Sequence, residues 1–179
     1  GVLAVLMILM FLRHQQSAPT GQKVGGAGFG SLRQMPGWVA ITGAYTAYGF
    51  CYLIAVSFLT SRLEDDAGYT ESLASTMFTL VGLGAVAGGI LMGVIADRIG
   101  ERTTLVVGFC VFASALVGIL TGVVAIVVVG SVIVGLMFGG LTSVVIGYVV
   151  RNTTAEAVGP SFAAATFAFG VAQVTSPQL

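Results

Sequence analysis

Charged residues are scarce in this chain. Seven of its 179 residues are basic and seven are acidic, 8% in total, whereas a soluble domain carries roughly 25%. One histidine and two cysteines offer little for a metal site or a disulfide framework. Hydrophobic residues make up 56% of the chain, and its mean hydropathy is +1.02. This composition excludes an ordinary soluble domain and indicates a protein surrounded by lipid.

The longest uncharged run predicts two membrane spans. No Asp, Glu, Lys or Arg occurs from Thr103 to Val150, and a helix over that run would be on the order of 70 Å long, about twice the ~30 Å hydrocarbon core of a bilayer. We expect the turn at Leu120-Thr121-Gly122, where Thr and Gly interrupt the aliphatic runs. The other gaps between charged clusters also have the length of a span. The sequence therefore predicts five membrane helices, over residues 37–61, 72–96, 104–121, 124–150 and 159–179.

The segment before these helices divides into two parts. Residues 1–12 are apolar but would reach only about 18 Å as a helix, so we interpret them as the end of a further span. Residues 13–36 are rich in Gly, Ser, Gln and Pro and contain three basic residues and no acidic one, which is typical of a linker. His14 stands beside Arg13 and is expected at the lipid interface. Because the chain begins with Gly, we expect it to be a fragment of a longer protein.

Basic residues fall on one side of the membrane when the spans alternate. Segments 13–36, 97–102 and 151–156 lie on the first side, and segments 62–71 and 121–124 lie on the second. The first side receives six basic residues, which are Arg13, Lys23, Arg33, Arg98, Arg102 and Arg151. The second receives only Arg62, among four acidic residues. Short loops rich in Lys and Arg stay in the cytoplasm, so we expect the first side to be cytoplasmic.

One loop resembles a family signature. The segment Gly93-Val-Ile-Ala-Asp-Arg-Ile-Gly-Glu-Arg102 resembles the signature loop of the major facilitator superfamily (MFS), in which a Gly, three residues, Asp-Arg, one residue and Gly precede two basic residues. The matching positions are Gly93, Asp97, Arg98, Gly100 and Arg102, whereas Glu101 replaces a basic residue. In that family the loop follows the second helix of each six-helix half. Two further segments show a weaker resemblance to an uncharacterised bacterial branch of the superfamily. They are Tyr48-Gly49-Phe50 and Phe169-Gly170-Val171-Ala172-Gln173.

The resemblance implies a fold and an activity. The chain is expected to be an all-α polytopic helical bundle, the partial second half of a secondary transporter. Residues 1–12 would be the end of helix six, residues 13–36 the cytoplasmic linker between halves, and residues 37–179 helices seven to eleven. The first half and helix twelve of the same protein would be missing partners, and a small solute would be moved by alternating access. By itself this chain is not expected to transport.

The signature loop also has a physical interpretation. Gly93 and Gly100 would allow helices to approach closely and the chain to reverse tightly. Asp97 stands at the tip of its helix, where it could dock on the positive N-terminus of another helix. In family members such a contact resembles a gate that breaks as the halves rock.

Two basic residues of the loop have alternative partners. Arg98 and Arg102 could bind lipid phosphate or pair with Glu101 and Glu156. An equally physical alternative is that the whole loop is only a cytoplasmic anchor, with no gating role.

Polar side chains on two helices are candidates for a substrate cavity. At about 100° per residue, an arc of roughly 80° contains Thr42, Tyr45, Gly49 and Tyr52, with Tyr48 at its edge. A tyrosine ring with its hydroxyl suits a cavity wall, but the same stripe could pack against a neighbouring helix. The last helix adds Thr166 and Gln173, seven residues apart, whose alternative role is hydrogen bonding between helices.

Glycines four residues apart predict close helix packing. The pairs are Gly84/Gly88, Gly89/Gly93 and Gly135/Gly139, with the small-xxx-small spacing of membrane helices. The segment Gly82-Leu-Gly84 superficially resembles a dinucleotide fingerprint. We reject that interpretation, because the fingerprint requires a preceding strand and a βαβ unit.

The sequence offers no catalytic centre. The predicted spans contain no Asp, Glu, Lys, Arg or His, and Cys51 and Cys110 are expected to be small hydrophobic residues buried in the membrane, without a disulfide. We therefore expect no enzyme, no cofactor, no metal and no nucleic-acid partner, and a lipid bilayer around the chain. An uncharged or amphipathic substrate suits such neutral helices, and any proton carrier would lie in the other half. The alternative is a non-catalytic membrane subunit or a channel half.

Overall fold

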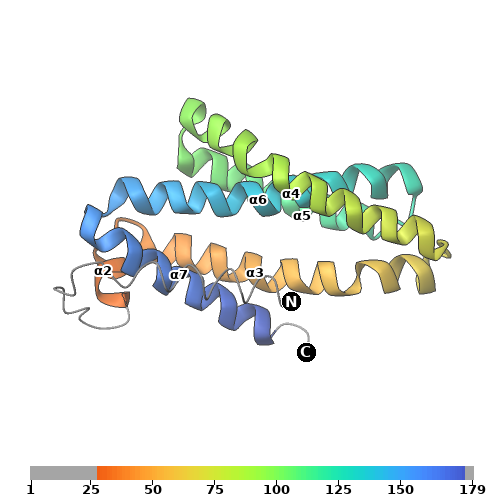
Figure 1. Ribbon diagram of the computed structural model, residues 1–179, viewed down its shortest axis with the longest axis horizontal. Coiled ribbons are helices and arrows are strands. Elements are labelled where there is room, and N and C mark those ends of the chain that lie inside the picture. The colour runs from red at the N-terminus through yellow and green to blue at the C-terminus, as the bar shows by residue number, and fades with distance from the viewer. Residues whose placement is uncertain (1–27, 176–179) are drawn as a thin grey trace, which may run out of the picture.

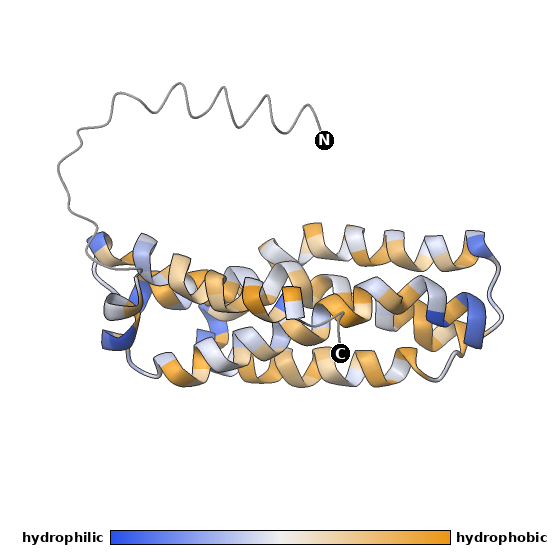
Figure 2. Ribbon diagram, turned by 90° about the horizontal axis from the view of Figure 1, so that it is seen from below, coloured by the Kyte–Doolittle hydropathy of each residue, from blue (hydrophilic) through white to orange (hydrophobic). Residues whose placement is uncertain are grey.

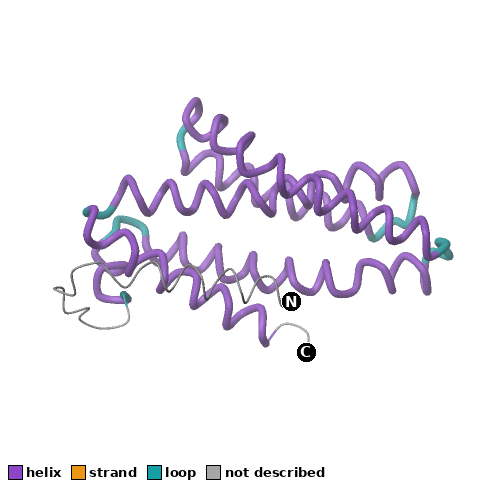
Figure 3. Tube along the Cα trace, viewed as in Figure 1, coloured by secondary structure: helices purple, strands orange, loops and turns teal. Residues whose placement is uncertain are grey.

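The described part of the chain is helical. The computed structural model describes residues 28–175, and no strand occurs among them (Figure 3). The helices are α2 (Phe29–Gln34), α3 (Trp38–Ser61), α4 (Glu71–Ile99), α5 (Glu101–Ile119), α6 (Val124–Asn152) and α7 (Ala155–Thr175), and a π-helical turn, η1 (Arg62–Asp66), extends α3. The expected all-α bundle is confirmed.

Five of these helices are long and apolar enough to cross a membrane: α3 with η1, α4, α5, α6 and α7. Residues of high hydropathy occupy much of the length of these helices (Figure 2). On α4, for example, Leu83, Val86 and Ile90 are 64%, 77% and 76% exposed. Such a surface would be unfavourable in water and is favourable in hydrocarbon. The chain is therefore an integral membrane protein with five spans among its described residues, as the sequence predicted.

Local sequence sets the ends of the helices. The Thr70 hydroxyl caps α4 by accepting a hydrogen bond from the Leu73 amide at 3.4 Å. At Gly100 the backbone has φ +85°, which lets α4 stop and α5 begin without an intervening loop. Gly122, at φ +66°, lies in the turn between α5 and α6. The predicted turn at residues 120–122 is confirmed.

The end of the predicted linker range is packed against the bundle. Helix α2 lies within residues 13–36, and its Leu32 is completely buried. The hydroxyl of Ser161 on α7 donates a hydrogen bond to the hydroxyl of Ser31 at 3.0 Å. Residues 1–12, and the linker up to residue 27, lie outside the described residues.

The most extensive helix contact joins α4 and α6, which cross in Figure 1. Glycines make this contact possible. A Cβ atom at Gly84 would lie 2.7 Å from the Val132 carbonyl oxygen, and Cβ atoms at Gly88, Gly135 and Gly139 would collide with the backbone of Leu136, Val81 and Ala85. The packing role of Gly84/Gly88 and Gly135/Gly139 is confirmed. The third pair is different: Gly89 lies near the Ser143 hydroxyl, but nothing lies within 4 Å of a Cβ at Gly93.

The connecting segments gather at two opposite ends of the bundle (Figure 1). At one, here called the acidic end, Arg62 donates to the Leu120 carbonyl at 3.4 Å and the Tyr69 hydroxyl donates to the Gly122 carbonyl at 3.1 Å. These bonds join the α3–α4 and α5–α6 connections. The other, here called the basic end, holds α2, the α4–α5 reversal and the α6–α7 connection, with Arg33, Arg98, Arg102 and Arg151.

Candidate functional site

Aromatic rings from four helices form one cluster inside the bundle. This aromatic cluster consists of Tyr45, Tyr48 and Tyr52 of α3, Phe109 and Phe112 of α5, Phe138 of α6 and Phe169 of α7. Tyr48 touches most of it: its ring lies 4.9 Å from that of Phe112, edge to face, and 6.0 Å from that of Phe169. Tyr45 stacks on Phe169 with centroids 4.5 Å apart. Such pairs stabilise the crossing of α3 with α5 and α7.

The hydroxyl of Tyr48 has no hydrogen-bond partner among the residues that the structure describes. Tyr48 is 3% exposed, and its oxygen lacks a hydrogen bond among the described residues. A buried hydroxyl without a partner is costly in hydrocarbon, so Tyr48 offers one free donor to a solute or a water molecule that reaches the cluster.

The predicted cavity residues are only partly brought together. Tyr45, Tyr48 and Tyr52 share the aromatic cluster, whereas Thr166 is exposed and Gln173 is half-buried. No local pattern in the sequence predicted the rings that meet these tyrosines, which are Phe109, Phe112 and Phe138. The only signal pointing to Phe169 was the family-like segment that begins with it.

The remaining candidate, Thr42, lines an open groove between α3 and α7. The groove has a volume of about 710 Å³ and is lined mainly by small residues, including Gly43, Ala47, Ala168 and Ala172. The hydroxyl oxygen of Thr42 is buried and has no partner among the described residues. A small polar solute or a neighbouring helix could lie along this groove.

An ion-pair cluster occupies the basic end. Arg151, in the last turn of α6, contacts two carboxylates: its Nη2 lies 2.5 Å from Asp97 Oδ1 at the end of α4, and its Nε lies 2.9 Å from Glu101 Oε1 at the start of α5. The side chains of Arg151 and Asp97 are 57% and 64% exposed, whereas that of Glu101 is only 13% exposed. One guanidinium therefore joins the ends of three helices.

These contacts differ from those we expected for the signature loop. Asp97 pairs with a guanidinium and not with the N-terminus of another helix, and Glu101 pairs with Arg151 and not with Arg98 or Arg102. Neither Arg98 nor Arg102 forms an ion pair within residues 28–175. The departure from the family pattern at Glu101 thus adds a second carboxylate to the cluster. A sequence signal existed, because Arg151 is the one basic residue in the last turn of α6.

The two loop glycines differ in their roles. Gly100 supports the reversal through its positive φ, as expected. Gly93 has open space around its Cα, so the expectation that it permits a close helix approach is wrong for the described contacts.

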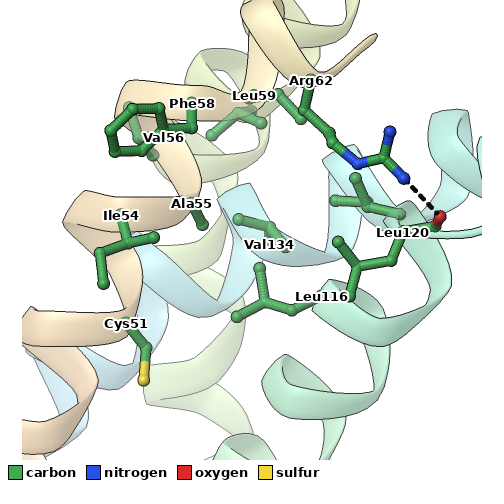
Figure 4. A pocket seen from close by; sticks show the side chains of 12 residues that line it. Cys51, Ile54, Ala55, Val56, Phe58, Leu59, Arg62, Leu116, Leu120 and Val134 are labelled. Carbon is green, nitrogen blue, oxygen red and sulfur yellow. Dashed lines mark hydrogen bonds between the residues drawn. The ribbon is translucent and has the colours of Figure 1, made fainter. Parts of the chain in front are cut away.

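A further cavity lies near the acidic end. It has a volume of about 360 Å³ between α3, α4, α5 and α6, and Figure 4 shows aliphatic side chains such as Ile54, Leu59, Leu116 and Val134 around it. Arg62 stands at its edge, donating to the Leu120 carbonyl (Figure 4) and pairing with Asp66 at 2.8 Å. The cavity therefore presents an apolar wall and no free charge.

The helical fold and the signature loop together define the class of protein, which is a polytopic helical membrane protein of transporter type. The whole chain, residues 1–179, matches the family described as "Uncharacterised MFS-type transporter YbfB". The chain belongs to this family of the major facilitator superfamily, and the resemblance seen in the signature loop is confirmed.

One curated relative has a related description. Over 79 residues the chain is 32% identical to a protein of Haemophilus influenzae named "Putative metabolite transport protein"; the alignment covers 43% of this chain and 19% of that protein. The chain thus matches about a fifth of the length of this relative. No solved structure matches the chain significantly.

Proposed function

We propose that this chain is part of the second half of a secondary transporter that moves a small, uncharged or amphipathic metabolite by alternating access. Membership of an MFS-type transporter family and the relative named for metabolite transport support this function. Helices α3 to α7 follow the order expected for helices seven to eleven, because the signature loop lies after the second of them. The binding site would lie between this bundle and the first half of the protein, at mid-membrane depth.

The basic end is proposed to face the cytoplasm of a bacterial inner membrane. Arg33, Arg98, Arg102 and Arg151 lie at that end, and the described residues of the acidic end contain one basic residue, Arg62, among the carboxylates of η1 and its flanks. Retention of Lys and Arg on the cytoplasmic side favours this orientation.

The observation that carries the proposal is the ion-pair cluster of Arg151, Asp97 and Glu101. It holds the α4–α5 reversal against the end of α6 in the conformation described here. An exposed ion pair contributes at most about 1 kcal/mol, which corresponds to roughly a fivefold change in the ratio of two conformations. Such a cluster is weak enough to open and strong enough to bias an equilibrium, which suits a latch on the cytoplasmic side.

The solute is proposed to contact the wall formed by α3 and α7. Thr42 lines the groove between these helices, and the hydroxyl groups of Thr42 and Tyr48 have no hydrogen-bond partner among the described residues. From Trp38 to Ser61 and from Ala157 to Thr175 these two helices contain no ionisable Asp, Glu, Lys, Arg or His. A neutral wall favours a neutral solute, and a proton-coupled mechanism would need its carrier in another part of the protein.

Transport by reconstituted full-length protein tests the proposal. Vesicles containing the protein are loaded with a panel of labelled uncharged metabolites, and counterflow is measured for the wild type, Arg151→Gln and the control Arg98→Gln. We expect counterflow of at least one metabolite, a several-fold change in rate for Arg151→Gln, and little change for Arg98→Gln, which breaks no described ion pair. Unchanged rates for Arg151→Gln would remove the latch, and counterflow by residues 1–179 alone would contradict the assignment to a partial half.

A further inference from the structure

A second cavity, at the basic end, combines an apolar lining with one cation. This basic-end cavity has a volume of about 460 Å³ between α3, α5 and α6. Its lining includes Ala40, Ile41 and Ala44 of α3, Leu105 and Phe109 of α5, and Arg102 at the start of α5. A volume of this size lies within the range of small-ligand sites.

Arg102 is the group of this cavity that is free to bind a ligand. The other polar side chain of its lining, Tyr148, already donates its hydroxyl to the Pro36 carbonyl at 2.9 Å. The carboxylate adjacent to Arg102 in the sequence is that of Glu101, which lies 2.9 Å from Arg151. No described acidic group pairs with Arg102.

The cavities at the acidic end and at the basic end differ in whether their arginine already has hydrogen-bond or ion-pair partners. At the acidic end, Arg62 is occupied by Asp66 and by the Leu120 carbonyl (Figure 4). At the basic end the guanidinium of Arg102 has no such partners among the described residues. An anionic headgroup would therefore be held at the basic end and not at the acidic end.

We propose that the basic-end cavity binds one anionic phospholipid, whose phosphate contacts Arg102 and whose acyl chain lies between α3 and α5. The helices on both sides are long and apolar enough to span the bilayer, so an acyl chain between them would lie at the depth of the membrane lipids. A guanidinium forms charge-assisted hydrogen bonds with phosphate, and basic pockets between membrane helices on the cytoplasmic side are suited to lipid headgroups. The apolar walls match a hydrocarbon chain. This inference does not depend on the transported solute.

Lipid binding to the purified full-length protein tests the proposal. The protein is delipidated in detergent, and its affinity for added phosphatidylglycerol is measured by native mass spectrometry, with phosphatidylcholine and inorganic phosphate as comparison ligands. Arg102→Gln removes the cation and Ala40→Phe fills the cavity. The matched controls are Arg98→Gln, in the same loop but outside the cavity, and Ala113→Phe, an exposed alanine of α5 that lines no described cavity. Size-exclusion chromatography establishes that each variant is folded.

The expected result is one tightly bound phosphatidylglycerol whose affinity falls about tenfold or more in Arg102→Gln, the loss expected for a charge-assisted hydrogen bond. Ala40→Phe should weaken binding to a similar extent, and both controls should bind as the wild type does. Equal losses in Arg98→Gln and Arg102→Gln would overturn the proposal, because they would indicate a diffuse basic surface. Equal retention of phosphatidylcholine, equally tight binding of inorganic phosphate, or undiminished binding by Ala40→Phe would each overturn it as well.

Discussion

The contact between α4 and α6 yields the sharpest stability prediction. Two glycines of α4, Gly82 and Gly88, can each be replaced by alanine. A Cβ at Gly88 would collide with the carbonyl group of Leu136 and lie 2.8 Å from its Cα, whereas a Cβ at Gly82 would meet nothing within 4 Å. Backbone atoms cannot rotate away, so in Gly88→Ala the two helices must separate at their most extensive contact.

The expected cost follows from this geometry. Overpacking of a tight interface destabilises by about 1–3 kcal/mol. Gly82→Ala should be neutral or slightly stabilising, because alanine has the higher helix propensity by up to about 1 kcal/mol. Thermal unfolding of the full-length protein in detergent measures the difference, at roughly 2–4 °C in Tm per kcal/mol for a domain of this size. If Gly88→Ala melts with the wild type and with Gly82→Ala, the reasoning about backbone contact is refuted.

Three other predictions concern two tyrosine hydroxyls, the α4–α5 reversal at Gly100 and the orientation of the chain in the membrane. Tyr48→Phe removes a buried hydroxyl that has no hydrogen-bond partner among the described residues, so Tm should stay unchanged or rise. Tyr148→Phe loses a hydrogen bond to the Pro36 carbonyl and should lower the free energy of unfolding by about 0.5–1.5 kcal/mol. A greater loss of stability in Tyr48→Phe than in Tyr148→Phe would contradict the assigned partners. Gly100→Ala must adopt φ +85° and should destabilise by about 1–3 kcal/mol in the same melting assay, although its Cβ would meet no atom. In intact cells with a cysteine-free background, an impermeant maleimide should label Asp65→Cys and not Gln34→Cys, and labelling of both would refute the proposed orientation.

The helix count and the turns could be predicted because charge is expelled from hydrocarbon. Uncharged runs therefore mark the spans, and the interruption at Leu120-Thr121-Gly122 marks a turn. The helices nevertheless extend past these limits: α5 begins at Glu101 and α7 at Ala155, before the expected starts at residues 104 and 159. Hydropathy reports where lipid ends, whereas a helix continues until its backbone hydrogen bonds stop, and charged residues at the interface do not stop them.

The candidate site could be predicted only in part. A helical period placed Tyr45 and Tyr52 on one face but put Tyr48 at its edge, although Tyr48 has ring contacts with two other helices. Periodicity describes one helix at a time. Which ring of α5 or α7 lies opposite depends on the crossing of whole helices, and lipid tails, which are as apolar as the side chains, supply little hydrophobic preference for one face over another.

By itself the sequence determined that the chain lies in a membrane and how many times its described part crosses, because both follow from the partition of residues between water and hydrocarbon. It also identified Gly84/Gly88 and Gly135/Gly139 as close helix contacts, because the missing Cβ permits them, but it wrongly added Gly93. Only the tertiary structure decided that Arg151 joins Asp97 and Glu101, while Arg102 has no carboxylate partner within residues 28–175. Asp97 and Arg151 are 54 positions apart in the chain. Their contact depends on the packing of α4 against α6, which fixes the relative positions of helix ends that no local pattern in the sequence relates.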